Sequence, residues 1–536
     1  MVELHEYSTP VCDENQSPSW LWMIFFGVLY ALIATFYFWV NHEVRPVWLD
    51  ESLTYYQVND RSFTELIRSF DFGINLLPYA YFFFPWAVGQ AVELNPLALR
   101  LPSLLFGVAA LIVIHRLLAK EFGNLVAFTT VFFTFIVTTE FQGYLSEARP
   151  YSLYTLLAAL HLQSTYALFT SGSRRAWWAN AFTSALFPSI QFVGLVYSFA
   201  AAFTLLVVSD NLKQAFQKAL SFVLGWGIFM MIHARLLWII FSGNSIADPN
   251  QFTPPTLTKA AQDLNQFFDF PAEISVCLIV MLAVAAIIRW KRPVEELAPP
   301  KAEFRFPSIY VLGTCVAWLF VPVGLKLIAA LGFVNLTIPR YLLPTLIATA
   351  IGIGTFLSIS LQLVERQAAP ESRFFWDNRG VLIARIALIA MVLLAMAESL
   401  GIQLRVVKAG RVSGDELFGR GLHLQERGGL DIFTTDIHRV FPYVYHTRHQ
   451  AVPPVGFIVG LDHLPTWKKF APQVRYTTFE EMMSTGTPLL LGVKHSEKDP
   501  TDQRLIDRFI RDGMQVKLLA SNEHSNLYRL SPPREN

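Results

Sequence analysis

Long apolar segments are the feature that most constrains the fold of this chain. A bilayer core of about 30 Å is crossed by about 20 helical residues, and eleven runs fit or nearly fit that length. They lie at 19–40, 102–118, 124–141, 150–170, 176–189, 191–208, 219–241, 273–290, 307–331, 342–364 and 380–400. A helix satisfies its own backbone hydrogen bonds inside lipid. The sequence therefore predicts a polytopic α-helical membrane protein with about 11 transmembrane helices.

The composition excludes several other classes of protein. Of the residues, 53% are hydrophobic and only 15% are charged, against about 25% charged in soluble domains. The net charge of +1 gives no reason to expect a nucleic-acid partner. The apolar run that begins at Trp20 is too long for the core of a cleavable signal, so we expect a retained first span.

One further apolar run, 76–92, is short and contains Pro78, Pro85 and Gly89. If it crossed the membrane, the N-terminus and the loop 41–75 would change sides. The first 18 residues contain no Lys or Arg, so charge alone leaves both topologies open.

Basic residues in the short loops indicate the orientation, because they favour the cytoplasmic side. If 76–92 does not cross, one side carries fourteen Lys and Arg residues and the other carries seven. The richer loops are 115–124, 171–176, 209–218, 289–306 and 365–379. We expect a plasma (inner) membrane protein whose N-terminus is inside and whose C-terminal tail is outside.

The composition changes after Gly401, where histidines and charged residues become frequent. The segments 430–436 and 488–495 are typical of buried strands, 502–513 has helical spacing with a Gly stop, and two more strands follow. We expect a transmembrane domain at 1–400, with a first outer loop at 41–101, and a soluble extracytoplasmic α/β domain at 401–536.

Charged residues of the outer loops are the first candidates for chemistry. Asp50 and Glu51 follow the first span, and 51–70 has the spacing of an amphipathic helix lying in the membrane interface. A carboxylate facing a cavity there serves as a general base or a metal ligand. A loop acid or helix cap has the same local sequence, and spacing alone favours that simpler interpretation of Asp50.

Two later outer loops add further candidates. Glu147 and Arg149 lie in the second outer loop, where they form either a local ion pair or a cavity site facing Asp50. Arg340 and Tyr341 precede the span at 342–364. An arginine at that position binds a phosphate through two parallel hydrogen bonds or anchors the chain at the interface.

Four segments together resemble the family 39 type of GT-C glycosyltransferases, the protein mannosyltransferase and aminoarabinose (lipid A) transferase relatives. They are WLDESLTYY, ALRLPSLLFGVAALIVIHRLLAKEFG, YLSEARPYSLYTLLAAL and RYLLP. The resemblance is strongest over 20–170 and returns at 340. It implies a long first outer loop with juxtamembrane helices, in which 76–92 does not cross.

The resemblance also implies roles for individual residues. Asp50 matches the catalytic base, and Glu147 matches an acid that positions the acceptor or a metal. Arg340, with Arg149 and Tyr341, matches the contacts to the donor phosphate. Further candidates for acceptor or cavity contacts are Glu51, Tyr55 and Asn75. A divalent metal (Mg or Mn), if one is used, would be held by Asp50 and Glu147.

The function implied is an inverting glycosyltransferase that uses a polyprenyl-phosphate sugar donor. The acceptor is a hydroxyl of a lipid, a glycan or a protein at the outer face of the membrane. One base and in-line attack require no second nucleophilic carboxylate. A transporter or flippase of lipid-linked sugars, and a surface-polysaccharide polymerase or ligase, remain alternatives.

Overall fold

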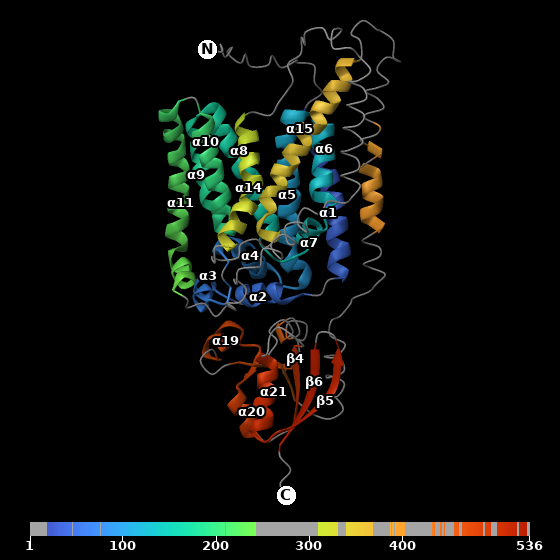
Figure 1. Ribbon diagram of the computed structural model, residues 1–536, viewed down its shortest axis with the longest axis vertical. Helices are drawn as coiled ribbons and strands as arrows, with labels where there is room; N and C mark the ends of the chain where they lie inside the picture. The colour runs from blue at the N-terminus through green and yellow to red at the C-terminus, as the bar shows by residue number, and fades with distance from the viewer. Residues whose placement is uncertain are drawn as a thin grey trace.

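The structure is a computed structural model. The described residues are 19–44, 47–59, 61–75, 77–209, 211–242, 309–330, 339–367, 386, 389–390, 392–401, 431–434, 440–441, 444, 455–459, 464–485, 488–494, 501–522 and 525–532. They form a helical bundle with a layer of short helices at one end, and beyond that layer an α/β sheet (Figure 1).

The bundle is built from helices that match the predicted apolar runs. They are α1 (Ser19–Val44), α5 (Pro96–Phe122), α6 (Asn124–Val131), α8 (Tyr151–Ser171), α9 (Arg174–Ile190), α10 (Gly194–Val208), α11 (Leu212–Phe241), α14 (Ile309–Ala330) and α15 (Leu343–Gln367). Among the described residues, α1, α5, α11 and α14 contain stretches long and apolar enough to cross a membrane. The several apolar helices support a multi-pass membrane protein, and the count of eleven spans stays a prediction.

Some of the predicted runs differ in detail from the helices. The run 124–141 is not one helix, because α6 passes into a π-helical turn at Phe132–Ile136 and α7 (Thr139–Leu145) follows. The run 380–400 is described only in part, chiefly at 392–401. The run 273–290 lies outside the described residues.

The first outer loop forms α2 (Leu49–Val58), α3 (Phe63–Ser69), two 3-10 turns at Phe70–Phe72 and Tyr79–Phe82, and α4 (Phe83–Ala91). The nine residues of α4 extend over only about 14 Å at 1.5 Å per residue. That length is less than half of a bilayer core. The run 76–92 therefore does not form a spanning helix, as the family resemblance implied.

The prediction of one amphipathic helix at 51–70 is wrong in two respects. The helix is interrupted, and α3 begins anew at a capping box made by Ser62 and Glu65. In addition, Glu51 and every later residue of α2 is buried, polar side chains included. The reason is its position, since Figure 1 shows α2 between the bundle and the C-terminal sheet.

The C-terminal part contains a sheet of strand order β3-β2-β1-β4-β6-β5. Strands β1 (Asp431–Thr434), β2 (Val455–Ile458), β3 (Arg475–Thr477) and β4 (Leu489–Lys494) are parallel, and β5 (Gln515–Asn522) and β6 (Ser525–Ser531) form an antiparallel edge. Helices α19 (Leu464–Phe470), α20 (Phe479–Thr485) and α21 (Thr501–Arg511) accompany it. The strands predicted at 430–436 and 488–495 correspond to β1 and β4.

Specific contacts join this sheet region to the first outer loop. Arg61 donates a hydrogen bond to the backbone carbonyl of Phe470 and lies against its ring. At the C-terminal half of α2, the rings of Tyr56 and Phe441 meet edge to face, 5.4 Å between centroids. The sheet and α2 therefore lie on the same side of the bundle.

Candidate functional site

Three charged residues from distant parts of the chain meet at one point. Asp50 lies in the first turn of α2, Arg149 in the turn before α8, and Arg340 in the 3-10 turn Pro339–Tyr341 before α15. The Oδ2 atom of Asp50 is 3.3 Å from Arg149 and 3.2 Å from Arg340. The structure thus brings together a predicted base and two predicted phosphate ligands.

An aromatic side chain supports both arginines. Tyr151, the first residue of α8, has Arg149 over its ring at 6.0 Å and Arg340 at 5.8 Å, distances at which a cation is attracted to an aromatic face. Arg340 also lies 5.6 Å from the ring of Tyr341. The Tyr151 hydroxyl is buried and has no hydrogen-bond partner among the described residues. Tyr151 therefore lies against both guanidinium groups at one aromatic face.

The charges of this cluster do not cancel. Burial lowers the pKa of the Arg149 guanidinium, but the negative charge of Asp50 outweighs it and the pKa lies above its ordinary value. At Arg340 burial acts in the same direction, and the oxygens of Tyr151 and Tyr341 together with Asp50 again raise the pKa. Two guanidinium cations therefore face one carboxylate. The excess positive charge favours a further anion at the site.

Access to the cluster is uneven. The side chain of Arg149 is 7% exposed, whereas that of Asp50 is 18% exposed and that of Arg340 28% exposed. The Nε atoms of both arginines are buried and lack hydrogen-bond partners within the described part of the chain. A ligand that approaches from solvent therefore meets Asp50 and Arg340 first, with Arg149 behind them.

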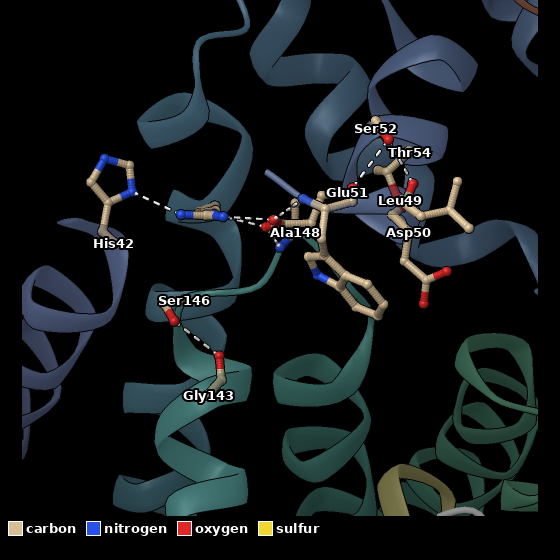
Figure 2. A network of polar contacts seen from close by, with 11 residues as sticks. His42, Leu49, Asp50, Glu51, Ser52, Thr54, Gly143, Ser146 and Ala148 are labelled. Carbon is tan, nitrogen blue, oxygen red and sulfur yellow. Dashed lines mark hydrogen bonds and ion pairs between the residues drawn. The ribbon is translucent and has the colours of Figure 1, made fainter. Parts of the chain in front are cut away.

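A second, deeper ion pair fixes the start of α2. Glu51 is fully buried, and its two carboxylate oxygens accept hydrogen bonds from Arg100 at 2.7 and 2.6 Å. The same carboxylate accepts from the backbone N–H of Ala148 at 2.8 Å. Figure 2 shows the side chain of Glu51 pointing into this network and that of Asp50 pointing away from it. The adjacent residues Asp50 and Glu51 therefore lie in two separate environments.

This network ties the first and second outer loops together. The Ala148 N–H lies one residue before Arg149, so the Glu51 carboxylate holds the second outer loop beside the first. Ser103 of α5 donates to the Arg149 carbonyl at 3.3 Å, and Arg149 itself donates to the Asp50 carbonyl at 3.4 Å. Glu51 is therefore an internal anchor. Its complete burial does not fit the acceptor or cavity contact expected from the sequence.

The remaining predicted residues lie in different environments. Asn75 is buried, donates to the side-chain oxygen of Gln57 at 2.9 Å and accepts from the N–H of Leu77 at 3.4 Å. Tyr55 is buried beside Tyr56, with 5.4 Å between ring centroids. Glu147 is half-buried in the turn before α8, where its carbonyl accepts from the Arg149 N–H at 2.8 Å. A catalytic role for Glu147 stays a prediction.

Two residues of this region were not among the candidates predicted from the sequence. Arg100 lies at the end of the predicted first outer loop, yet it is buried in the first turns of α5. A cation so close to a long apolar run is costly unless it is paired. The position of Arg100 beside such a run could therefore have indicated a buried ion pair. Tyr151 stands two residues after Arg149 within the ARPY segment. Nothing in the spacing distinguishes it from an interfacial tyrosine.

Of the two carboxylates expected to hold a divalent metal ion, Asp50 and Glu147, Asp50 is already paired with two arginines. A Mg or Mn site needs several oxygen ligands, usually more than one carboxylate. Here the candidate ligand Asp50 is already shared by two guanidinium cations, which would repel a divalent cation. No group of three or more His, Cys, Asp or Glu side chains suitable for a metal occurs within the described ranges. We therefore assign no chemical step to a metal.

Comparison with known proteins identifies the fold. No protein-family model matches the chain, and no curated protein matches its sequence. The crystal structure of ArnT from Cupriavidus metallidurans bound to undecaprenyl phosphate matches with a TM-score of 0.53 and 13% identity, over 96% of this chain and 98% of that chain. The apo structure of the same protein gives a TM-score of 0.52 and 13% identity, over 94% and 98%.

A third solved structure is less similar. The Archaeoglobus fulgidus oligosaccharyltransferase, in complex with Zn and sulfate, matches with a TM-score of 0.42 and 13% identity, over 84% of this chain and 62% of that chain. ArnT is a GT-C fold glycosyltransferase. The likeness to ArnT extends over nearly the full length of both chains. The GT-C resemblance predicted from the sequence is therefore confirmed at the level of the fold.

Proposed function

We propose that this protein is an inverting glycosyltransferase that takes a sugar from a polyprenyl-phosphate donor. The observation that carries the proposal is the meeting of Asp50, Arg149 and Arg340 within a GT-C fold. The similar ArnT was crystallised with undecaprenyl phosphate bound to it. A half-buried site with excess positive charge is suited to the same class of anion.

The chemistry requires few groups from the protein. Transfer breaks the bond between the anomeric carbon and the phosphate oxygen, and the phosphate leaves as a stable anion. Arg340 and Arg149 stabilise the charge that develops on it. The oxygen of the acceptor hydroxyl bonds to the anomeric carbon, and the Asp50 carboxylate accepts the proton that this hydroxyl loses. Attack opposite to the leaving phosphate inverts the configuration at that carbon.

We place the reaction at the outer face of a plasma (inner) membrane. The loop charges support this orientation, and the contacts of Arg61 and Tyr56 put the C-terminal sheet on the same side as α2. The C-terminal domain is then extracytoplasmic, and it shapes the access of the acceptor. That acceptor is a lipid, glycan or protein hydroxyl.

A second candidate function has one observation in its favour. A polysaccharide polymerase or ligase uses a diphosphate-linked donor, and two adjacent arginines provide enough contacts for two phosphate groups. One experiment separates the candidates. Purified protein is incubated with radiolabelled polyprenyl-phosphate and polyprenyl-diphosphate sugars, and release or transfer of label is measured. Use of a monophosphate donor supports our proposal, and use of diphosphate donors alone overturns it.

The same experiment needs a matched control variant. Asp71, in the first outer loop, also pairs with an arginine, Arg235 of α11, but that arginine is largely exposed. Asp71→Asn should therefore transfer label like the wild-type protein, whereas Asp50→Asn should not. Transfer of label by Asp50→Asn at the wild-type rate would contradict the assignment of the base.

A further inference from the structure

The two arginines at Asp50 are held in different ways. Arg149 contacts both the carboxylate and the backbone carbonyl of Asp50, and its own carbonyl accepts a hydrogen bond from Ser103. Arg340 reaches the carboxylate through one nitrogen, its Nη1, at 3.2 Å. Arg340 is also the more exposed of the two. Its pairing with Asp50 is thus the more easily exchanged.

A donor phosphate would compete with Asp50 for this guanidinium. A phosphate monoanion or diester offers two or more oxygens, and a guanidinium binds such oxygens through parallel hydrogen bonds. The Asp50 carboxylate uses only Nη1 of Arg340 and leaves its Nε without a partner among the described residues. Rotation of Arg340 toward a phosphate would complete its hydrogen bonding and remove one cation from Asp50.

We propose that Arg340 is exchanged between Asp50 and the donor phosphate, so that binding of the donor releases Asp50 to act as the base. This inference rests on the proposed function. In the resting site both guanidinium groups lie against the same carboxylate oxygen, Oδ2, and leave it little room to meet an acceptor hydroxyl. With the donor bound, Arg149 alone positions Asp50. Arg149 then positions the base while its charge still acts on the departing phosphate, and Arg340 is the principal phosphate ligand.

The proposal predicts how variants bind undecaprenyl phosphate, a probe that involves no transfer step. Asp50→Asn removes the competing carboxylate, so its affinity for the probe should rise about three- to tenfold over wild type, as expected for one partly exposed ion pair. Arg340→Ala should bind more weakly. The gain caused by Asp50→Asn should disappear in the Arg340→Ala background and persist in the Arg149→Ala background.

This double-mutant cycle distinguishes exchange of Arg340 between Asp50 and the phosphate from simple repulsion between Asp50 and the phosphate. If Asp50 only repelled the phosphate through space, its removal would help equally in both backgrounds, because effects of independent sites add. A gain that survives in the Arg340→Ala background overturns the proposal, and so does an unchanged or reduced affinity in Asp50→Asn. Asp71→Asn is the matched control and should bind like the wild-type protein.

The outcomes also separate this inference from the proposed function. If the wild-type protein does not bind undecaprenyl phosphate, the proposed function fails. If it binds and Asp50→Asn loses transfer without a gain in affinity, only the exchange of Arg340 fails. Should Asp50→Asn prove unfolded in a thermal unfolding measurement, the same cycle is carried out with Asp50→Ala, for which the same gain in affinity is expected.

Discussion

The carboxylate of Glu51 and the guanidinium of Arg100 form a two-pronged ion pair from which solvent is almost completely excluded. The pair joins α2 to α5, and the Glu51 carboxylate also accepts from the backbone of the second outer loop. Glu51 is the residue that follows Asp50 in the chain. The geometry of the candidate site therefore depends on a contact that no substrate reaches.

Loss of this pair should destabilise the protein strongly. Glu51→Gln keeps the shape of the side chain but leaves the Arg100 cation buried without a counter-charge, a change that costs about 3–5 kcal/mol. Unfolding by denaturant in detergent micelles measures the effect. Asp71→Asn removes half of an exposed pair with Arg235, and should cost about 1 kcal/mol or less. Equal losses in the two variants would contradict an anchoring role for Glu51.

Replacement of the proposed base should abolish transfer without unfolding the protein. Asp50→Asn preserves size, and we expect the rate of transfer to fall by about 10²–10⁴-fold, the usual contribution of a general base. The rate is measured with labelled donor at saturating concentration, and thermal unfolding checks the fold. A rate close to that of the wild-type protein would remove Asp50 from the mechanism.

Truncation of the outer arginine should act mainly on the donor. Arg340→Ala removes a charge-assisted contact, so the donor concentration at half-maximal rate should rise about 10-fold or more. Arg340→Lys restores the charge but not the planar fork, and should recover only part of the loss. Rates are measured over a range of donor concentrations. A normal donor dependence in Arg340→Ala would count against a phosphate contact.

The sequence predicted the parts of this fold that depend on composition and on the local spacing of apolar residues. Most of the long apolar runs that fall within the described residues correspond to helices, and the strands at 430–436 and 488–495 were evident from their apolar patterns. The helix at 51–70 was predicted less well, because its spacing implied a lipid-facing stripe. In the folded protein the polar face of α2 is buried against Arg100 and the second outer loop.

The site was predictable only in part, for a related reason. Asp50, Arg149 and Arg340 were each identified from loop position and family resemblance, but no local pattern shows that two arginines share one carboxylate oxygen. Nor does spacing distinguish Asp50 from Glu51, which are neighbours with opposite environments. That distinction arises when α5 and the second outer loop pack against one face of α2.

Removal of divalent metal should leave transfer intact. The Asp50 carboxylate is shared by Arg149 and Arg340, whose charges oppose a second cation at the same oxygen. We expect the rate after treatment with EDTA to stay within about twofold of the untreated rate, because Arg340 and Arg149, rather than a metal, stabilise the departing phosphate. The measurement compares chelated protein with the same sample after Mg or Mn is restored. A complete loss that either metal reverses would show that Asp50 changes partners to bind a cation.

Close packing between α9 and α11 should be sensitive to a single methyl group. A Cβ at Gly225 of α11 would lie 2.5 Å from the backbone oxygen of Ala181 and 2.6 Å from Cβ of Ser184 in α9. Backbone atoms cannot move aside cheaply, so Gly225→Ala should destabilise the protein by about 1–3 kcal/mol.

A second glycine of α11 provides the matched control for this substitution. A Cβ at Gly227 would have no neighbouring atom within 4 Å among the described residues. Gly227→Ala should therefore be neutral or stabilising by up to about 1 kcal/mol, because alanine has the higher helix propensity. Thermal unfolding in detergent micelles compares Gly225→Ala with Gly227→Ala. Equal unfolding temperatures would show that α9 and α11 pack less closely than the structure indicates.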